Sequence, residues 1–213
     1  MTRSGRSSPL AASPEIAADT RAPFVLASAS PRRLALLRQA GLEPSVVIAP
    51  EIDETPRKGE VPRLYALRVA VAKTEIVAAK EKGSFVLAAD TVVAAGRRIL
   101  PKADDDAEVA RCLKLLSGRR HQVLTALALK PPDKPMRTRV VMTRVAFKVL
   151  SPREIDAYVA SGEGIGKAGG YAVQGRAEAF VRAINGSYSN VVGLPLYETL
   201  GLLEGSGWMS GAV

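Results

Sequence analysis

A run of ten residues, FVLAADTVVA at positions 85–94, is apolar except for Thr91 and one charged side chain, Asp90. Its length and composition are typical of a buried strand. A carboxylate inside such a strand is costly unless a cation or a metal ion compensates its charge. The alternative is that a neighbouring lysine or backbone N–H satisfies Asp90, which then has no further role. The run therefore predicts a core strand and marks Asp90 as a candidate functional residue.

A second short stretch combines a strand, a serine-rich turn and a helix. The strand FVLA at 24–27 leads into SASPRR, where Ser30 is a candidate N-cap followed by a proline. A helix start presents unpaired N–H groups to an anion, and Ser28 and Ser30 add hydroxyl donors. Arg32 and Arg33 add charge suited to phosphate oxygens. Taken alone, the stretch is explained more simply as a capped helix with two surface arginines.

Strands and helices are mixed along the chain, which predicts an α/β fold. Helices are expected at about 31–40, 63–82, 104–117, 151–161 and 196–203, and strands at about 24–27, 45–48, 85–94, 99–100, 121–129, 139–150 and 179–184. The glycine-rich GEGIGKAGGYAVQG is expected to run into a strand, and NGSYSNVVGLP to be a loop. We expect a single domain at 24–204, a disordered extension at 1–23 and a frayed end at 205–213.

The net charge of +9 limits the classes of partner. The first 23 residues contribute little of it, so the folded part is basic and suits a polyanion, with a solvated basic surface as the alternative. Aromatic residues make up only 5% of the chain, which argues against a stacking platform for single-stranded nucleic acid. The single cysteine, Cys112, excludes an internal disulfide and fits a reducing cytoplasm. No apolar run is long enough to predict a transmembrane helix.

Eight short motifs follow one another along the chain: SASPRR, DET, AVAKTE, AADT, PKADD, LSGRRHQVLTALAL, GKAGGYAVQG and INGSYSNVVGLPLYET. Together they resemble the Maf family of nucleoside triphosphate pyrophosphatases, over about residues 24–203. The resemblance implies a two-lobed mixed sheet flanked by helices with a central cleft, related to inosine triphosphate pyrophosphatases. It also implies cleavage of a nucleoside triphosphate into a monophosphate and pyrophosphate, a divalent metal cofactor (Mg or Mn), and a homodimer.

The resemblance assigns roles to residues that match its motifs. Asp90 matches the proton acceptor, and Glu54 matches an acidic position that, with Asp90, would hold the metal. The implied substrate-binding residues are Ser28, Ser30, Arg33, Lys73 and Lys102. The residues themselves leave plainer alternatives: Glu54 as a solvated loop carboxylate, and Lys73 as an exposed helix position. Lys102 lies in Pro-Lys-Ala, where the family commonly has Gly-Lys-Pro.

Three further positions separate branches of this family, namely Arg32, Thr91 and Gln174. They resemble the branch that acts on dTTP and UTP, and modified pyrimidine nucleotides are further expected substrates. A neutral Gln amide can both donate to and accept from a uracil or thymine ring, whereas the cationic base of 7-methyl-GTP would be repelled by Arg32. The alternatives are a purine-specific inosine-type pyrophosphatase and a nonenzymatic nucleic-acid-binding regulator of cell division. Neither a membrane nor a specific nucleic acid is expected as a partner.

Overall fold

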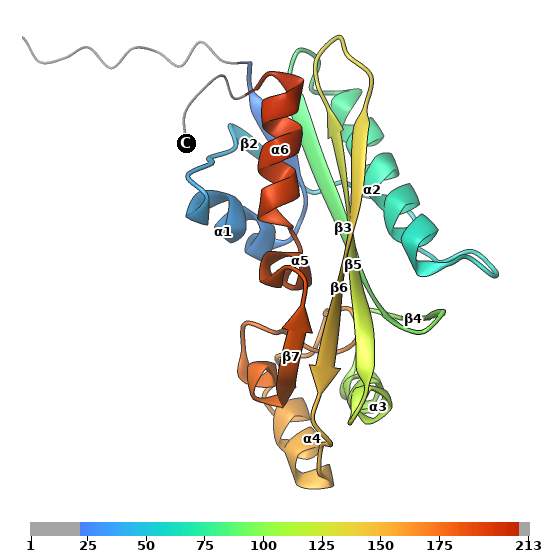
Figure 1. Cartoon of the computed structure of the whole chain (residues 1–213). Coiled ribbons are helices and arrows are strands. Elements are labelled where there is room, and N and C mark those ends of the chain that lie inside the picture. The colour runs from blue at the N-terminus through green and yellow to red at the C-terminus, as the bar shows by residue number, and fades with distance from the viewer. Residues whose placement is uncertain (1–21, 209–213) are drawn as a thin grey trace, which may run out of the picture.

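The computed structural model describes residues 22–208, which form one mixed seven-stranded sheet flanked by helices (Figure 1). The strands are β1 (Phe24–Ala27), β2 (Val46–Ile48), β3 (Phe85–Ala95), β4 (Arg98–Leu100), β5 (Arg120–Lys130), β6 (Arg137–Phe147) and β7 (Val181–Asn185). Their order is β2-β1-β3-β5-β6-β7, and β4 pairs with β3. β1 is parallel to β2 and β3, while the remaining pairs are antiparallel. The predicted α/β class is confirmed.

The helices divide between the two faces of the sheet. They are α1 (Pro31–Gln39), α2 (Pro62–Ala78), α3 (Asp106–Leu116), α4 (Pro152–Val159), α5 (Tyr188–Val192) and α6 (Leu196–Ser206), with a 3-10 turn at Arg176–Phe180. Helix α2 packs its small side chains against alanines and valines of β3 and β5 on one face. Helices α1, α3, α4 and α6 pack into the larger cluster on the other face. The long strands β3, β5 and β6 run from α1, α2 and α6 at one end to α3 and α4 at the other (Figure 1).

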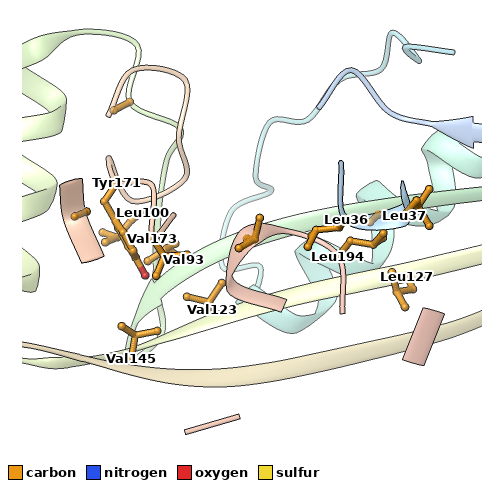
Figure 2. Close-up of a cluster of buried hydrophobic side chains, with 14 of the residues drawn as sticks. Leu36, Leu37, Val93, Leu100, Val123, Leu127, Val145, Tyr171, Val173 and Leu194 are labelled. Carbon is orange, nitrogen blue, oxygen red and sulfur yellow. The ribbon is translucent and has the colours of Figure 1, made fainter. Parts of the chain in front are cut away.

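The larger core cluster has two groups of side chains along these strands. Figure 2 shows Leu36, Leu37, Leu127 and Leu194 at one end and Val93, Leu100, Tyr171 and Val173 at the other. The two groups belong to one continuous cluster, and Val123 lies between them.

The sheet leaves a gap along one side of β3, and this gap positions the site. Strand β1 pairs with β3 only as far as Ala88, and β4 begins to pair with the same side at Val93. Residues 89–92 of β3, which include Asp90 and Thr91, lie between these two pairings. The turn after β1 and the segment after β4 both enter this gap, so motifs far apart in sequence meet there.

Several elements differ from the prediction. Gly169 and Gly170 adopt φ values of 67° and 69°, so the glycine-rich segment forms turns and one isolated bridge rather than a strand. The predicted loop 185–195 contains α5, whose N-cap Ser187 accepts a hydrogen bond from the Asn190 N–H. Strand β6 ends at Phe147, which leaves Val149 exposed rather than in line with Val145.

The C-terminal expectation is wrong for residues 205–208. Helix α6 continues to Ser206, and Trp208 is buried against Phe24, with its ring centre 4.8 Å from that of the phenylalanine. The Trp208 Nε1–H donates to the Ala22 carbonyl at 2.9 Å. Burial of an aromatic ring offsets the entropy cost of ordering this end of the chain. The expectations for residues 1–21 and 209–213 lie outside the described residues.

Among residues 22–208, no helix has both the length and the hydropathy needed to cross a membrane.

Candidate active site

The turn after β1 brings a helix start and two arginines to the gap beside β3. Ser30 has the extended backbone of an N-cap, but its side chain makes no capping hydrogen bond. The backbone N–H of Ser30 donates to the Ser28 hydroxyl at 3.1 Å. The proline at the first helical position lacks an N–H, and its fixed φ suits the first turn. The Arg33 N–H bonds back to the Ser30 carbonyl at 3.2 Å, so the serine hydroxyls and the arginine side chains, more than the backbone, supply donors at this helix start.

Arg33 is buried and held at three points. Its Nε donates to the Gly193 carbonyl at 2.9 Å, Nη1 to the Ser28 hydroxyl at 3.1 Å, and Nη2 to the Thr91 hydroxyl at 3.2 Å. Burial lowers the pKa of Arg33 against the opposing charge of Asp90. Arg32 is half-buried and donates through Nε to the Val192 carbonyl at 3.4 Å. Both guanidinium groups are thus oriented by carbonyls at the end of α5 and just after it.

Two carboxylates and two ammonium groups form a chain of ion pairs across the gap. The Lys73 Nζ lies 2.8 Å from Asp90 Oδ1 and 2.8 Å from Glu54 Oε1, and Lys102 pairs with the other oxygen of Glu54. Lys73 and Asp90 are buried, with 6% and 2% of their surfaces exposed. The alternative of an exposed Lys73 is therefore wrong, because the buried side of α2 carries Tyr65 and Val69 rather than Leu64.

The pKa values of the two carboxyl groups are shifted in opposite directions. Burial raises the pKa of Asp90 above its ordinary value, although Lys73 and Arg33 act in the opposite direction. Burial also acts to raise the pKa of Glu54, but its hydrogen bonds with Lys102 and Lys73 outweigh it and hold that pKa below the ordinary value. Glu54 therefore gives up its proton more readily than an ordinary glutamate, and Asp90 binds a proton more readily than an ordinary aspartate.

The donor set fits a divalent metal only in part. Glu54 and Asp90 offer the carboxylate oxygens that Mg or Mn prefers, and both face the same Lys73 ammonium. Within residues 22–208 there is no cluster of three or more acidic, histidine or cysteine side chains that could hold a metal. Magnesium commonly takes one or two carboxylates from the protein and its other ligands from water and substrate phosphates. The site suits a metal that arrives together with a nucleotide.

The wall opposite α1 comes from the glycine-rich segment. Gln174 is exposed and lines the cavity together with Lys167 and the buried Tyr171. The Tyr171 hydroxyl lies 2.8 Å from His121 Nε2, and the two rings meet edge to face. Burial lowers the pKa of His121 to about 4, so this histidine is neutral at pH 7. The wall is therefore anchored in the core by an uncharged pair.

All the predicted site residues line one cavity of about 310 Å³. These are Ser28, Ser30, Arg32, Arg33, Glu54, Lys73, Asp90, Thr91, Lys102 and Gln174. Their convergence is a finding of the structure, whereas the role of each residue stays a prediction.

Sequence reasoning missed some residues that shape this cavity. The carbonyls of Val192 and Gly193 orient the two arginines, and Tyr171 and Val173 form part of the wall. Gly193 has a φ of 131°, which a side chain rarely adopts, so the glycine in NVVGLP was the available signal. Backbone acceptors carry no signal of their own in a sequence.

Comparisons with known proteins give matches over most of the chain. A dTTP/UTP pyrophosphatase of Caulobacter vibrioides is 61% identical over 185 residues, covering 87% of this chain and 96% of that protein. A dTTP/UTP pyrophosphatase of Zymomonas mobilis is 59% identical over 185 residues, covering 87% of this chain and 92% of that protein. Among solved structures, a dITP/XTP pyrophosphatase from Mycobacterium abscessus aligns with a TM-score of 0.41 at 22% identity, covering 66% of this chain and 95% of that one. The model of the Maf-like protein family matches residues 23–206. The chain belongs to the Maf family.

Proposed function

We propose that this protein hydrolyses dTTP and UTP between the α and β phosphates, releasing the nucleoside monophosphate and pyrophosphate. The observation that carries the proposal is a buried carboxylate, Asp90, in the same cavity as Arg33, Lys73 and Lys102. A triphosphate needs such a concentration of cationic groups, and the attack of water on phosphorus needs a proton acceptor beside it. The dTTP/UTP pyrophosphatases that are about 60% identical over most of the chain support the same activity.

In this proposal Asp90 orients the attacking water and accepts its proton. Lys73 balances the charge of the Asp90 carboxylate before the reaction, because the two groups are 2.8 Å apart. Arg33 and Lys102 counter the negative charge that develops as pyrophosphate leaves. Ser28, Ser30 and the start of α1 hold phosphate oxygens through hydroxyl and N–H donors.

A divalent metal, Mg or Mn, belongs to the proposal as a cofactor held by Glu54 and Asp90 together with the phosphates. When bound, it would neutralise phosphate charge. Lys73 bridges the two carboxylates in the substrate-free structure, so its ammonium must give way when the metal and nucleotide enter. Tight binding of metal to the free protein is not expected.

The base would lie against the opposite wall of the cavity. In this proposal Gln174, which lines the cavity, reads the polar edge of uracil or thymine, since a neutral amide provides both a donor and an acceptor. The half-buried Arg32 disfavours a cationic base such as 7-methylguanine. The family resemblance implies a specificity role for Thr91 as well, but its hydroxyl accepts from Arg33 Nη2 at 3.2 Å, so we do not assign Thr91 to the base itself. We also propose a homodimer, from the same resemblance, and a cytoplasmic protein without a specific nucleic-acid partner, from the single cysteine and the few aromatic residues.

The proposal is tested with purified protein, Mg or Mn, a nucleotide panel and detection of released pyrophosphate. The panel contains dTTP, UTP, 5-methyl-UTP, CTP, ITP and 7-methyl-GTP. We expect dTTP and UTP to have the highest kcat/KM. A preference for 7-methyl-GTP or ITP would contradict the pyrimidine specificity. Salt-sensitive DNA binding without hydrolysis of any nucleotide would instead favour the nonenzymatic alternative.

A further inference from the structure

A row of two threonine hydroxyl groups, one half-buried and one fully buried, connects Arg33 across two strands of the sheet to α5. Thr91 on β3 and Thr125 on β5 are directly paired in the antiparallel register, and their hydroxyl oxygens are 2.9 Å apart. Thr125 is fully buried and donates its hydroxyl proton to the Asn190 carbonyl at 3.0 Å. Thr125 is outside the cavity, and neither the motifs nor the proposed mechanism gives it a role.

The chemistry of a hydroxyl group fixes the direction of this row. Each threonine has one O–H proton to donate, and Thr125 gives its proton to Asn190. Thr125 must therefore accept the proton of Thr91, which leaves the Thr91 oxygen free to accept from Arg33 Nη2. The 3.5 Å separation between the Thr91 hydroxyl and the Gly193 carbonyl is the weaker alternative. The bonds then run one way, from the Arg33 cation to a carbonyl, so each bond strengthens the next.

The far end of the row is fixed in the core. The Asn190 side chain donates to the Val123 carbonyl at 3.1 Å and to the Thr143 hydroxyl at 3.0 Å. Three residues later the Gly193 carbonyl accepts from Arg33 Nε at 2.9 Å. The segment around α5 therefore holds the guanidinium group at one point directly and at a second point through the two threonines.

We propose that Thr125 is a positioning residue that fixes the plane of the Arg33 guanidinium through Thr91. It follows that Thr91 acts on the phosphate end of the nucleotide, through Arg33, rather than on the base. The inference rests on the proposed contact between Arg33 and the triphosphate. A guanidinium group binds phosphate through two parallel N–H bonds, so the strength of binding depends on its orientation more than it does for a lysine ammonium.

The first test replaces the Thr125 hydroxyl by a methyl group of similar volume, Thr125→Val, in the full chain. Because Arg33 then loses its fixed plane, we expect kcat/KM for both dTTP and UTP to fall about tenfold. The ratio of the two kcat/KM values should stay within about twofold, because the wall that carries Gln174 is unchanged. Thr125→Ser keeps the hydroxyl and should restore most of the activity. The matched control is Thr199→Val, because Thr199 in α6 is equally buried and its hydroxyl donates to the carbonyl of the N-cap residue Pro195, away from the cavity.

A double-mutant cycle separates positioning from loss of stability. In an Arg33→Ala background, Thr125→Val should cause less than about a twofold further loss of kcat/KM, because the group it orients is gone. A full tenfold loss in that background would overturn the inference. An altered dTTP:UTP ratio with unaltered affinity for inorganic tripolyphosphate would overturn it too, because Thr91 would then be acting on the base.

Calorimetric titration with inorganic tripolyphosphate keeps this test separate from the proposed function. If the wild type hydrolyses no nucleotide but binds tripolyphosphate, the proposed function fails. Weaker binding to Thr125→Val would then still support the positioning role, and equal binding would overturn it. A wild type that neither hydrolyses nucleotides nor binds tripolyphosphate would overturn both.

Discussion

Lys73 and Asp90 form a buried ion pair, with the ammonium nitrogen 2.8 Å from the carboxylate oxygen. The lysine comes from α2 and the aspartate from the centre of β3, so the pair joins the helix to the sheet at the cavity. The same ammonium also reaches Glu54 in the loop before α2. One cation thus holds both acidic groups of the site in place.

Removing the carboxylate charge should abolish catalysis without abolishing binding. Asp90→Asn keeps the side-chain volume but cannot accept a proton from water, so hydrolysis of dTTP should fall by about a hundredfold or more. Nucleotide affinity, measured by calorimetry, should remain. Asp156→Asn, at an exposed position of α4, is the matched control. Turnover near the wild-type level in Asp90→Asn would show that Asp90 is not the base.

Removing the cation should cost stability as well as activity. Lys73→Met leaves the Asp90 charge buried without its nearest partner, and breaking such a pair typically costs about 3–5 kcal/mol. The double variant Lys73→Met/Asp90→Asn removes both charges and should regain much of the free energy of unfolding, measured in urea. Lys80→Met, at an exposed position after α2, is the control and should have no effect. Equal stability of the single and double variants would contradict this account of the pair.

The wall of the cavity that carries Gln174, against which we place the base, should be sensitive to a change in hydrogen bonding. Gln174→Glu removes the amide donor and adds a negative charge, so kcat/KM for dTTP and UTP should fall about tenfold or more. The affinity for inorganic tripolyphosphate should stay close to that of the wild type. Gln39→Glu, at the exposed end of α1, is the control. Unchanged kinetics in Gln174→Glu would remove Gln174 from base recognition.

The buried histidine makes the stability of the protein depend on pH. Burial lowers the pKa of His121 from 6.5 to about 4, so the unfolded chain binds more protons between these values. The contribution of His121 to the free energy of unfolding is therefore fully present above about pH 6.5 and is lost as the pH falls to about 4. The total loss is about 3 kcal/mol. Acidic side chains also titrate in this range, but they do so equally in the wild type and in His121→Gln. The measurement is therefore the difference in unfolding free energy between these two proteins. A difference that does not change between pH 7 and pH 4.5 would contradict the prediction.

Two glycines of the glycine-rich segment, Gly166 and Gly169, provide a matched pair of variants. Gly166 and Gly169 have φ values of 69° and 67°, but a Cβ on Gly166 meets open space, whereas one on Gly169 would lie 2.8 Å from Val93. Both alanine variants should lose about 1–2 kcal/mol from the backbone conformation. Gly169→Ala alone should also displace the segment that carries Tyr171 and raise KM for dTTP. Equal effects on KM would contradict the close approach to Val93.

The sequence predicts most of the regular elements but not how they meet. Strand β1 agrees residue for residue with the apolar run 24–27, and the capping box at Ser151 and Glu154 marks the start of α4 correctly. Helix α2 is different because apolar residues occur all around it, so hydropathy alone selects the wrong face. Its buried lysine is explained only by the two carboxylates that approach it from β3 and from the preceding loop.

The site shows the same division between local and long-range information. The motif resemblance provides every predicted site residue, whereas the local residue patterns mark Asp90 and the turn after β1. That these residues share one cavity depends on β3 continuing beyond the end of β1, which is a property of the sheet register. The roles of Thr125 and of the carbonyls after α5 arise from contacts between residues 34 to 160 positions apart, for which one sequence has no pattern.

The bond between Trp208 and Ala22 brings the two ends of the described chain to the same place beside β1. A short peptide could join them, and new ends could be opened at Gly83, which is exposed between α2 and β3. Such a circular permutant would carry Lys73 and Asp90 near opposite ends of its chain, so that only the native fold reunites them.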